Sequence, residues 1–238
     1  MNLPDWDSEI QPEPLPVNIA NLIQTVALYA IPVLFAITVH EAAHGYAARH
    51  FGDDTAWMMG RVTLNPARHI DPVGTILMPL MLYFATSGAF LFGYAKPVPV
   101  RFDNLRNPKR DMVWVALAGP GANLVMAILW GIGFYLLLGA GVEEAFFLGM
   151  CKAGLGVNIG LFVFNLFPLP PLDGGRILVG LLPMRQAMAV SKLEPYGFFI
   201  VIALIYFQIL NTWWMRPLSA LTEFMIIQLL TPLAMLIS

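Results

Sequence analysis

Long apolar stretches alternate with short polar segments along this chain of 238 residues. A transmembrane helix needs about 20 mostly apolar residues to cross a hydrocarbon core of about 30 Å. The apolar stretches cover 19–50, 73–94, 112–138, 145–167, 196–210 and 218–236. This pattern predicts an all-α polytopic membrane protein with about five to six transmembrane helices.

Composition supports the same class. The chain is 58% hydrophobic and 12% charged, with a mean hydropathy of +0.69, whereas soluble domains carry about 25% charged residues. We expect residues 1–18 to form an acidic, proline-rich tail and residues 19–238 to form a single membrane-embedded domain within the lipid bilayer. The tail lacks the basic segment of a cleaved signal peptide, so the first apolar stretch should remain in the mature protein.

Charge restricts the partners and sets an orientation. The formal net charge is -2 and no basic face is evident, which argues against a nucleic-acid partner. The acidic N-terminus belongs outside, while the loop 95–111, with the richest basic cluster, belongs inside. This places a multi-pass protein in the inner (plasma) membrane, with the inner end of the first helix on the cytoplasmic side.

The stretch 73–94 is interrupted at Thr86-Ser87-Gly88, and the orientation above puts both of its ends inside. We interpret it as a re-entrant element, with a full crossing as the alternative. The β-rich piece 61–64, followed by Asn65-Pro66, predicts a strand and turn. Together these features predict a re-entrant or β-hairpin element near the inner end of the first helix.

That inner end carries His40-Glu41-Ala42-Ala43-His44. Residues four apart lie on one face of an α-helix, so His40 and His44 can bind one metal ion with Glu41 beside them. The HExxH pattern is typical of zinc peptidases, in which the glutamate moves protons to and from the reacting groups. A histidine pair that is merely hydrogen-bonded at the membrane interface is the alternative.

A catalytic zinc ion usually has three protein ligands. Asp173 is the best third candidate, because the predicted topology brings it to the inner side with His40 and His44; a helix-ending Asp-Gly turn is the alternative. Gly174 and Gly175 are expected to let the chain turn sharply after Asp173. His69 and Asp71 could also bind metal, although an interfacial turn explains them better.

These motifs together resemble the site-2 protease family of intramembrane zinc metalloproteases, in a small bacterial form without PDZ or CBS modules. The resemblance rests on the HEAAH segment, Gly119-Pro120 with Asn123, the segment 93–100 and the segment 165–174. It covers nearly the whole chain from about residue 20. The order of the motifs makes the resemblance specific, whereas HExxH alone would fit any zincin.

The resemblance implies that His40, His44 and Asp173 bind one catalytic Zn²⁺ and that Glu41 activates the water. It also implies that the side-chain amide of Asn165 stabilises the oxyanion. A hydrogen bond that serves helix packing is the alternative for Asn165, and it is the role we expect for Asn123 and Asn158. An extended substrate would pair with a strand near the site, for which 61–64 and 90–94 are candidates.

The sequence therefore predicts a zinc metalloendopeptidase that hydrolyses peptide bonds in or near transmembrane segments of membrane proteins, as in regulated intramembrane proteolysis. A noncatalytic zinc-binding transporter or scaffold is the alternative from another class. Glu41 favours the enzyme, because a mere metal site needs no general base, and the later apolar stretches lack the polar residues of an ion path. A soluble-type metallopeptidase with membrane anchors fits less well, since HEAAH lies inside an apolar helix.

Overall fold

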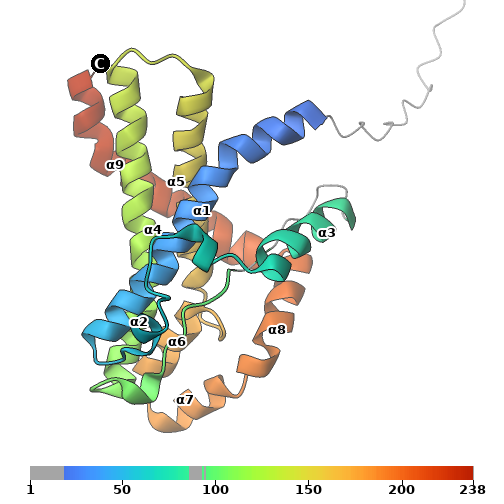
Figure 1. The fold of residues 1–238 in the computed structure, drawn as a ribbon, viewed down its shortest axis with the longest axis vertical. Helices are drawn as coiled ribbons and strands as arrows, with labels where there is room; N and C mark the ends of the chain where they lie inside the picture. The colour runs from blue at the N-terminus through green and yellow to red at the C-terminus, as the bar shows by residue number, and fades with distance from the viewer. Residues whose placement is uncertain (1–18, 86–92, 94, 238) are drawn as a thin grey trace, which may run out of the picture.

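The computed structural model describes residues 19–85, 93 and 95–237, and every regular element in this part of the chain is helical (Figure 1). The helices long and apolar enough to cross a membrane are α1 (Ile19–His50), α4 (Pro108–Gly139), α5 (Ala145–Asn165) and α9 (Arg216–Ile237), the last extended at its start by the turn η4 (Asn211–Met215). Two shorter helices, α7 (Met184–Ser191) and α8 (Glu194–Tyr206), meet at a 65° bend and could form one broken span. The prediction of an all-α membrane protein is confirmed. The described helices supply four candidate spans, or five with the bent pair, so the expected count of five to six stays a prediction.

Helix α4 is the central helix of the bundle. It contacts α1, α5, α9 and the short helix α6 (Asp173–Leu181) (Figure 1). The core between α4, α5 and α9 is formed by the apolar residues Ala127, Ile159, Val163, Ile226 and Leu230. Small residues bring these helices together, as at Gly154, where an added Cβ would overlap the ring of Trp130. Large apolar side chains such as Phe35 and Leu129 point outward, as expected of a surface that faces lipid.

Short elements connect α1 to α4 along the chain. They are α2 (Thr55–Met58), η1 (Pro66–Arg68), η2 (Pro72–Leu77), α3 (Met78–Ala85) and η3 (Phe102–Asn104). Residues 72–85 thus form two short helices of 6 and 8 residues, and 86–92 and 94 lie outside the described residues. Whether 73–94 is re-entrant or crosses the membrane remains a prediction, and so does the role of 90–94.

The strand predicted at 61–64 is not formed: this piece has a bent, irregular backbone. Backbone groups of this piece bond to nearby residues and not to a strand partner, as where the Arg61 N–H donates to the Ala56 carbonyl. The imidazole of His69 bonds the carbonyl of Thr63 at 2.9 Å, and Asn65 caps the turn η1 by accepting from the Ala67 N–H. Local side-chain bonds of this kind compete with sheet formation, so the β-hairpin element is not found among the described residues.

The glycine pair after Asp173 does not produce the expected sharp turn. Asp173 is the first residue of α6, and Gly174 and Gly175 continue the helix. The two glycines allow close packing, because an added Cβ on either residue would overlap the backbone of the loop 166–170. The loop therefore lies directly against the first turn of α6 and fixes the position of Asp173.

Candidate metal centre and active site

The two histidines of the HEAAH segment project from α1 into the bundle and are almost fully buried, each 8% exposed. Their Nε2 atoms lie 3.1 Å apart. This follows from the helical repeat, which stacks residues four apart on one face. Both rings are packed against α4 at Gly119, where an added Cβ would overlap His44 Nε2 and lie 2.7 Å from His40 Cε1.

The Nδ1 atom of each ring is hydrogen-bonded to an oxygen acceptor. His44 Nδ1 lies 2.7 Å from the carbonyl oxygen of Val115, and His40 Nδ1 lies 2.6 Å from Oδ1 of Asn123. Since neither oxygen can donate, each Nδ1 carries the proton and each Nε2 presents a lone pair. The short Nε2–Nε2 distance is therefore not a hydrogen bond between the two rings.

Asp173 brings a carboxylate to the same point from the start of α6. Its Oδ2 lies 3.3 Å from each Nε2, and this buried oxygen has no hydrogen-bond partner. Tetrahedral zinc with ligands at about 2.0–2.2 Å separates neighbouring ligand atoms by about 3.3–3.6 Å. Two lone pairs and an unpartnered carboxylate oxygen at this spacing fit a divalent cation.

Across the part of the chain that the structure describes, His40, His44 and Asp173 form the one group of three or more potential ligands within reach of a common metal ion. The structure thus brings together the three residues named from the sequence. It places His69 and Asp71 elsewhere, at the end of η1 and the start of η2; that this turn lies at the membrane interface stays a prediction. His69 bonds the Thr63 carbonyl, and Asp71 caps η2 by accepting from the N–H groups of Val73 and Gly74.

Glu41 and Asn165 line the cavity of about 220 Å³ that contains the metal group. Glu41 Oε2 accepts a hydrogen bond of 2.7 Å from the Val98 N–H. The amide nitrogen of Asn165 donates to the Leu161 carbonyl at 3.0 Å, which leaves its second N–H for another acceptor. Both predicted catalytic side chains therefore share one space with the metal group.

Asn123 has a role beyond the packing expected from the sequence. Its amide nitrogen donates to the Ala36 carbonyl and to Oδ1 of Asn158, and Asn158 donates in turn to the Gly154 carbonyl. This chain of bonds aims the Asn123 oxygen at His40. Such outer partners orient metal-binding imidazoles. A signal was present in the sequence, because a fully buried amide in the middle of a membrane span needs a partner.

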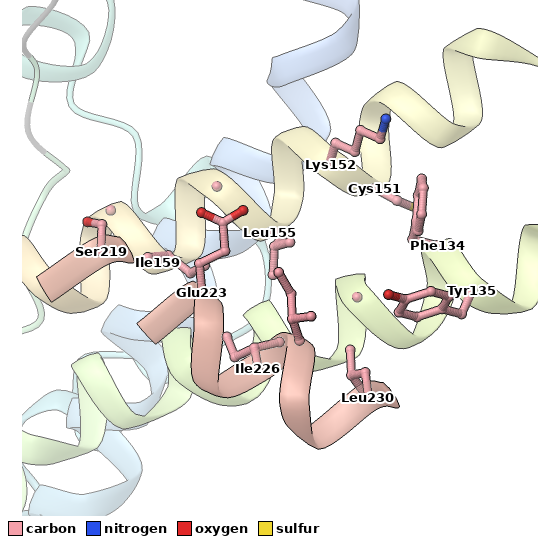
Figure 2. A pocket seen from close by; sticks show the side chains of 14 residues that line it. Phe134, Tyr135, Cys151, Lys152, Leu155, Ile159, Ser219, Glu223, Ile226 and Leu230 are labelled. Carbon is pink, nitrogen blue, oxygen red and sulfur yellow. The ribbon is translucent and has the colours of Figure 1, made fainter. Parts of the chain in front are cut away.

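A larger cavity of about 460 Å³ lies between α4, α5 and α9 (Figure 2). Figure 2 shows Glu223 of α9 and Lys152 of α5 at its wall, with Tyr135 of α4. Its lining contributes no residue to the metal group. Size alone therefore does not locate the chemistry, and the smaller cavity is the candidate active site.

Comparisons with known proteins agree with this geometry. The sequence profile described as "Peptidase family M50" matches residues 28–154 and 147–208. The chain is 41% identical over 182 residues to the protein of Bacillus subtilis (strain 168) named "Putative zinc metalloprotease YwhC", covering 73% of this chain and 78% of that protein.

Mycobacterial proteins named "Putative zinc metalloprotease Rip2" are also similar. That of Mycolicibacterium smegmatis (strain ATCC 700084 / mc(2)155) is 28% identical over 199 residues, covering 81% of this chain and 74% of that protein. That of Mycobacterium tuberculosis (strain ATCC 25618 / H37Rv) is 30% identical over 196 residues, or 80% and 73% of the two chains. No solved structure matches the chain significantly. With the profile matching most of the chain and the HEAAH helix and Asp173 meeting at one metal group, the chain belongs to peptidase family M50, the site-2 proteases, and is a zinc metalloprotease.

Proposed function

We propose that this protein is an intramembrane endopeptidase that hydrolyses peptide bonds in or near the transmembrane segments of membrane proteins, in the manner of regulated intramembrane proteolysis. One observation carries the proposal. A group able to bind zinc, with a glutamate beside it, lies inside a bundle of apolar helices rather than in a water-exposed domain. A peptide bond that reaches this site arrives through or beside the bilayer, which we assign to the inner membrane of a bacterial cell.

In the proposed mechanism His40, His44 and Asp173 hold one zinc ion. When bound, zinc supplies Lewis-acid activation of a water molecule and polarises the scissile carbonyl. Glu41 accepts the proton of the attacking water and then delivers it to the nitrogen of the leaving amine, so that the C–N bond breaks with proton balance. Burial of the site excludes bulk water and strengthens these electrostatic interactions.

Asn165 is assigned to the developing oxyanion. One of its two N–H bonds is used by the Leu161 carbonyl, which fixes the amide plane and leaves the other N–H to donate. A donor that is already oriented needs no reorganisation when charge appears on the carbonyl oxygen. The shared cavity supports this role, because Asn165 and the metal group line the same space.

The test is cleavage of a panel of tagged single-span membrane proteins by the purified protein in detergent, with bound zinc measured in parallel. We expect wild type to cut at least one member, and Glu41→Gln to retain zinc while losing cleavage by about 10²-fold or more. Glu223→Gln is the matched control, since it makes the same chemical change in the other cavity, and it should cut like wild type. Equal cutting by wild type and Glu41→Gln would overturn the mechanism.

A further inference from the structure

The carboxylate of Glu41 is held by a backbone amide from a distant part of the chain. Val98 N–H donates to Glu41 Oε2 at 2.7 Å, and Val98 is only 7% exposed. A bond from an N–H to a carboxylate is charge-assisted and short. It occupies one carboxylate oxygen and leaves Oε1 to exchange a proton, so the position of Val98 sets the direction in which Glu41 can act.

The segment that contains Val98 cannot hold its own position by a regular hydrogen-bond ladder. Pro97 and Pro99 flank Val98, and proline has no N–H to donate. The two rings keep this segment extended, but stiffness alone does not fix its distance from α1. The segment therefore depends on contacts made by other parts of the chain.

Arg61 makes such a contact. Its Nη2 donates to the carbonyl oxygens of Lys96 at 3.0 Å and Pro97 at 3.3 Å, the two residues directly before Val98. Arg61 is itself tied down, because its backbone N–H donates to the Ala56 carbonyl at 2.9 Å. Both bonds use the two hydrogens of one guanidinium nitrogen, whose directions are fixed by the planar group, whereas the ammonium of lysine rotates freely.

Close packing completes the arrangement. Gly45 lies one turn after Glu41 on α1, and an added Cβ there would stand 2.7 Å from Val62 Cγ2 and 3.3 Å from Val98 Cγ1. The backbone of α1 is thus in near contact with the residue that follows Arg61 and with Val98 itself. Glu41, Val98 and Arg61 lie in one continuous chain of contacts.

From this chain of contacts we infer that Arg61 is a positioning residue for the hydrolytic reaction: it clamps the Lys96-Pro97 carbonyls so that the Val98 N–H holds the Glu41 carboxylate in its working orientation. The inference rests on the proposed function of Glu41 and adds Arg61, which is neither in the metal group nor in the lining of its cavity. Arg61 touches neither the substrate nor the metal in this role. Its loss should slow turnover and leave substrate binding and zinc binding intact.

Kinetics provide the first test. Arg61→Ala should lower kcat by about tenfold to a hundredfold, as expected when a catalytic group is misplaced by about 1 Å, with KM within about twofold of wild type and zinc content unchanged. Arg61→Lys, whose ammonium can still donate but lacks the fixed directions of the guanidinium, should recover part of kcat. Arg68→Ala is the control, because it removes an exposed arginine from the same connector, and it should match wild type. Wild-type kcat in Arg61→Ala, or a rise in KM alone, would overturn the assignment.

A second test removes the amide itself. Val98→Pro deletes the N–H that reaches Glu41, whereas Val98→Ala keeps the N–H and removes only the packing against Gly45. Loss of kcat in the proline variant with retained zinc, and a smaller loss in the alanine variant, would support the clamp. Equal effects of the two substitutions would contradict it, since the side chain and not the amide would then matter.

Hydrogen exchange tests the clamp without any substrate. Because prolines have no amide hydrogen, a peptide covering 97–100 reports only on Val98 and Val100. Arg61→Ala should speed exchange in this peptide by about tenfold, while Arg68→Ala leaves it unchanged. Unchanged protection in Arg61→Ala would refute the clamp even if no substrate were cut. Failure of the proposed function would appear separately, as equal cutting by wild type and Glu41→Gln.

Discussion

Gly119 of α4 and His44 of α1 are so close that a single added methyl group on Gly119 would overlap the imidazole Nε2. The same methyl group would stand 2.7 Å from His40 Cε1. The two imidazoles can therefore occupy their positions in the metal group only because Gly119 has no side chain. Helix–helix contact through glycine, familiar as a packing device in membranes, here provides the space for the metal-binding rings.

Gly119→Ala should abolish zinc binding. Alanine favours the helix more than glycine does, so α4 should persist while the two imidazoles are pushed out of register with Asp173. Zinc per chain, measured by elemental analysis of the purified protein, should fall well below that of wild type, and helical content should be unchanged.

The control for this substitution lies two residues along the same helix. An added Cβ on Gly121 meets nothing within 4 Å, so Gly121→Ala should keep its zinc. If Gly119→Ala retained a full complement of zinc, the close approach of α4 to the histidine rings would be wrong.

Asn123→Ala should weaken zinc binding without abolishing it. The substitution removes the oxygen that accepts from His40 Nδ1. Nothing then fixes the orientation of the ring or keeps its proton on Nδ1. Loss of such an outer partner lowers metal affinity by about 10–100-fold. Competition with a fluorescent chelator measures this affinity, and Asn158→Ala, one bond further from His40, should have a smaller effect. An affinity for zinc equal to that of wild type would contradict the orienting role of Asn123.

The separation along the sequence between two paired residues decides whether their contact could be predicted from the sequence. The pairing of His40 with His44 is local, because it depends only on the helical repeat, and the apolar pattern located α1 at residues 19–50. The partnership of His40 with Asn123 joins residues 83 positions apart, and that of Glu41 with Val98 joins residues 57 apart. Periodicity carries no information on such contacts. The strand expected at 61–64 is not formed for a related reason, since the bond from the His69 imidazole to the Thr63 carbonyl overrides local β-propensity.

Asn165→Ala should lower kcat and leave zinc binding unchanged. If its free N–H stabilises the oxyanion, the loss should be about 10²–10³-fold in kcat, the usual effect of removing one such donor. Asn211→Ala is the control, because Asn211 bonds Gln208 in another part of the fold. A loss confined to KM would instead assign Asn165 to substrate binding.

Asp53 gives a pH-dependent test of the connector that follows α1. Its carboxylate is fully buried and accepts bonds from Thr55, from the Arg101 N–H at 2.7 Å and from Asn104. Burial alone would raise the pKa of Asp53, but the bonds from Thr55, Arg101 and Asn104 hold it below its ordinary value. Through these bonds the ionised carboxylate of Asp53 holds the segment that follows α1 against Arg101 and Asn104.

A lowered pKa means that the folded protein binds this proton less readily than the unfolded chain does. The stabilisation is therefore complete above the unfolded pKa of about 3.9 and is lost as the pH falls below it. Asp53→Asn replaces an acceptor by a donor that faces other donors, and it should lower the free energy of unfolding by about 1–3 kcal/mol at pH 7. Thermal unfolding of the zinc-free protein in detergent should show this difference shrinking between pH 5 and pH 3. Asp54→Asn, at the exposed neighbouring position, should change stability by less than about 1 kcal/mol throughout. A loss in Asp53→Asn that stayed constant across this pH range would show that shape, and not charge, accounts for the role of Asp53.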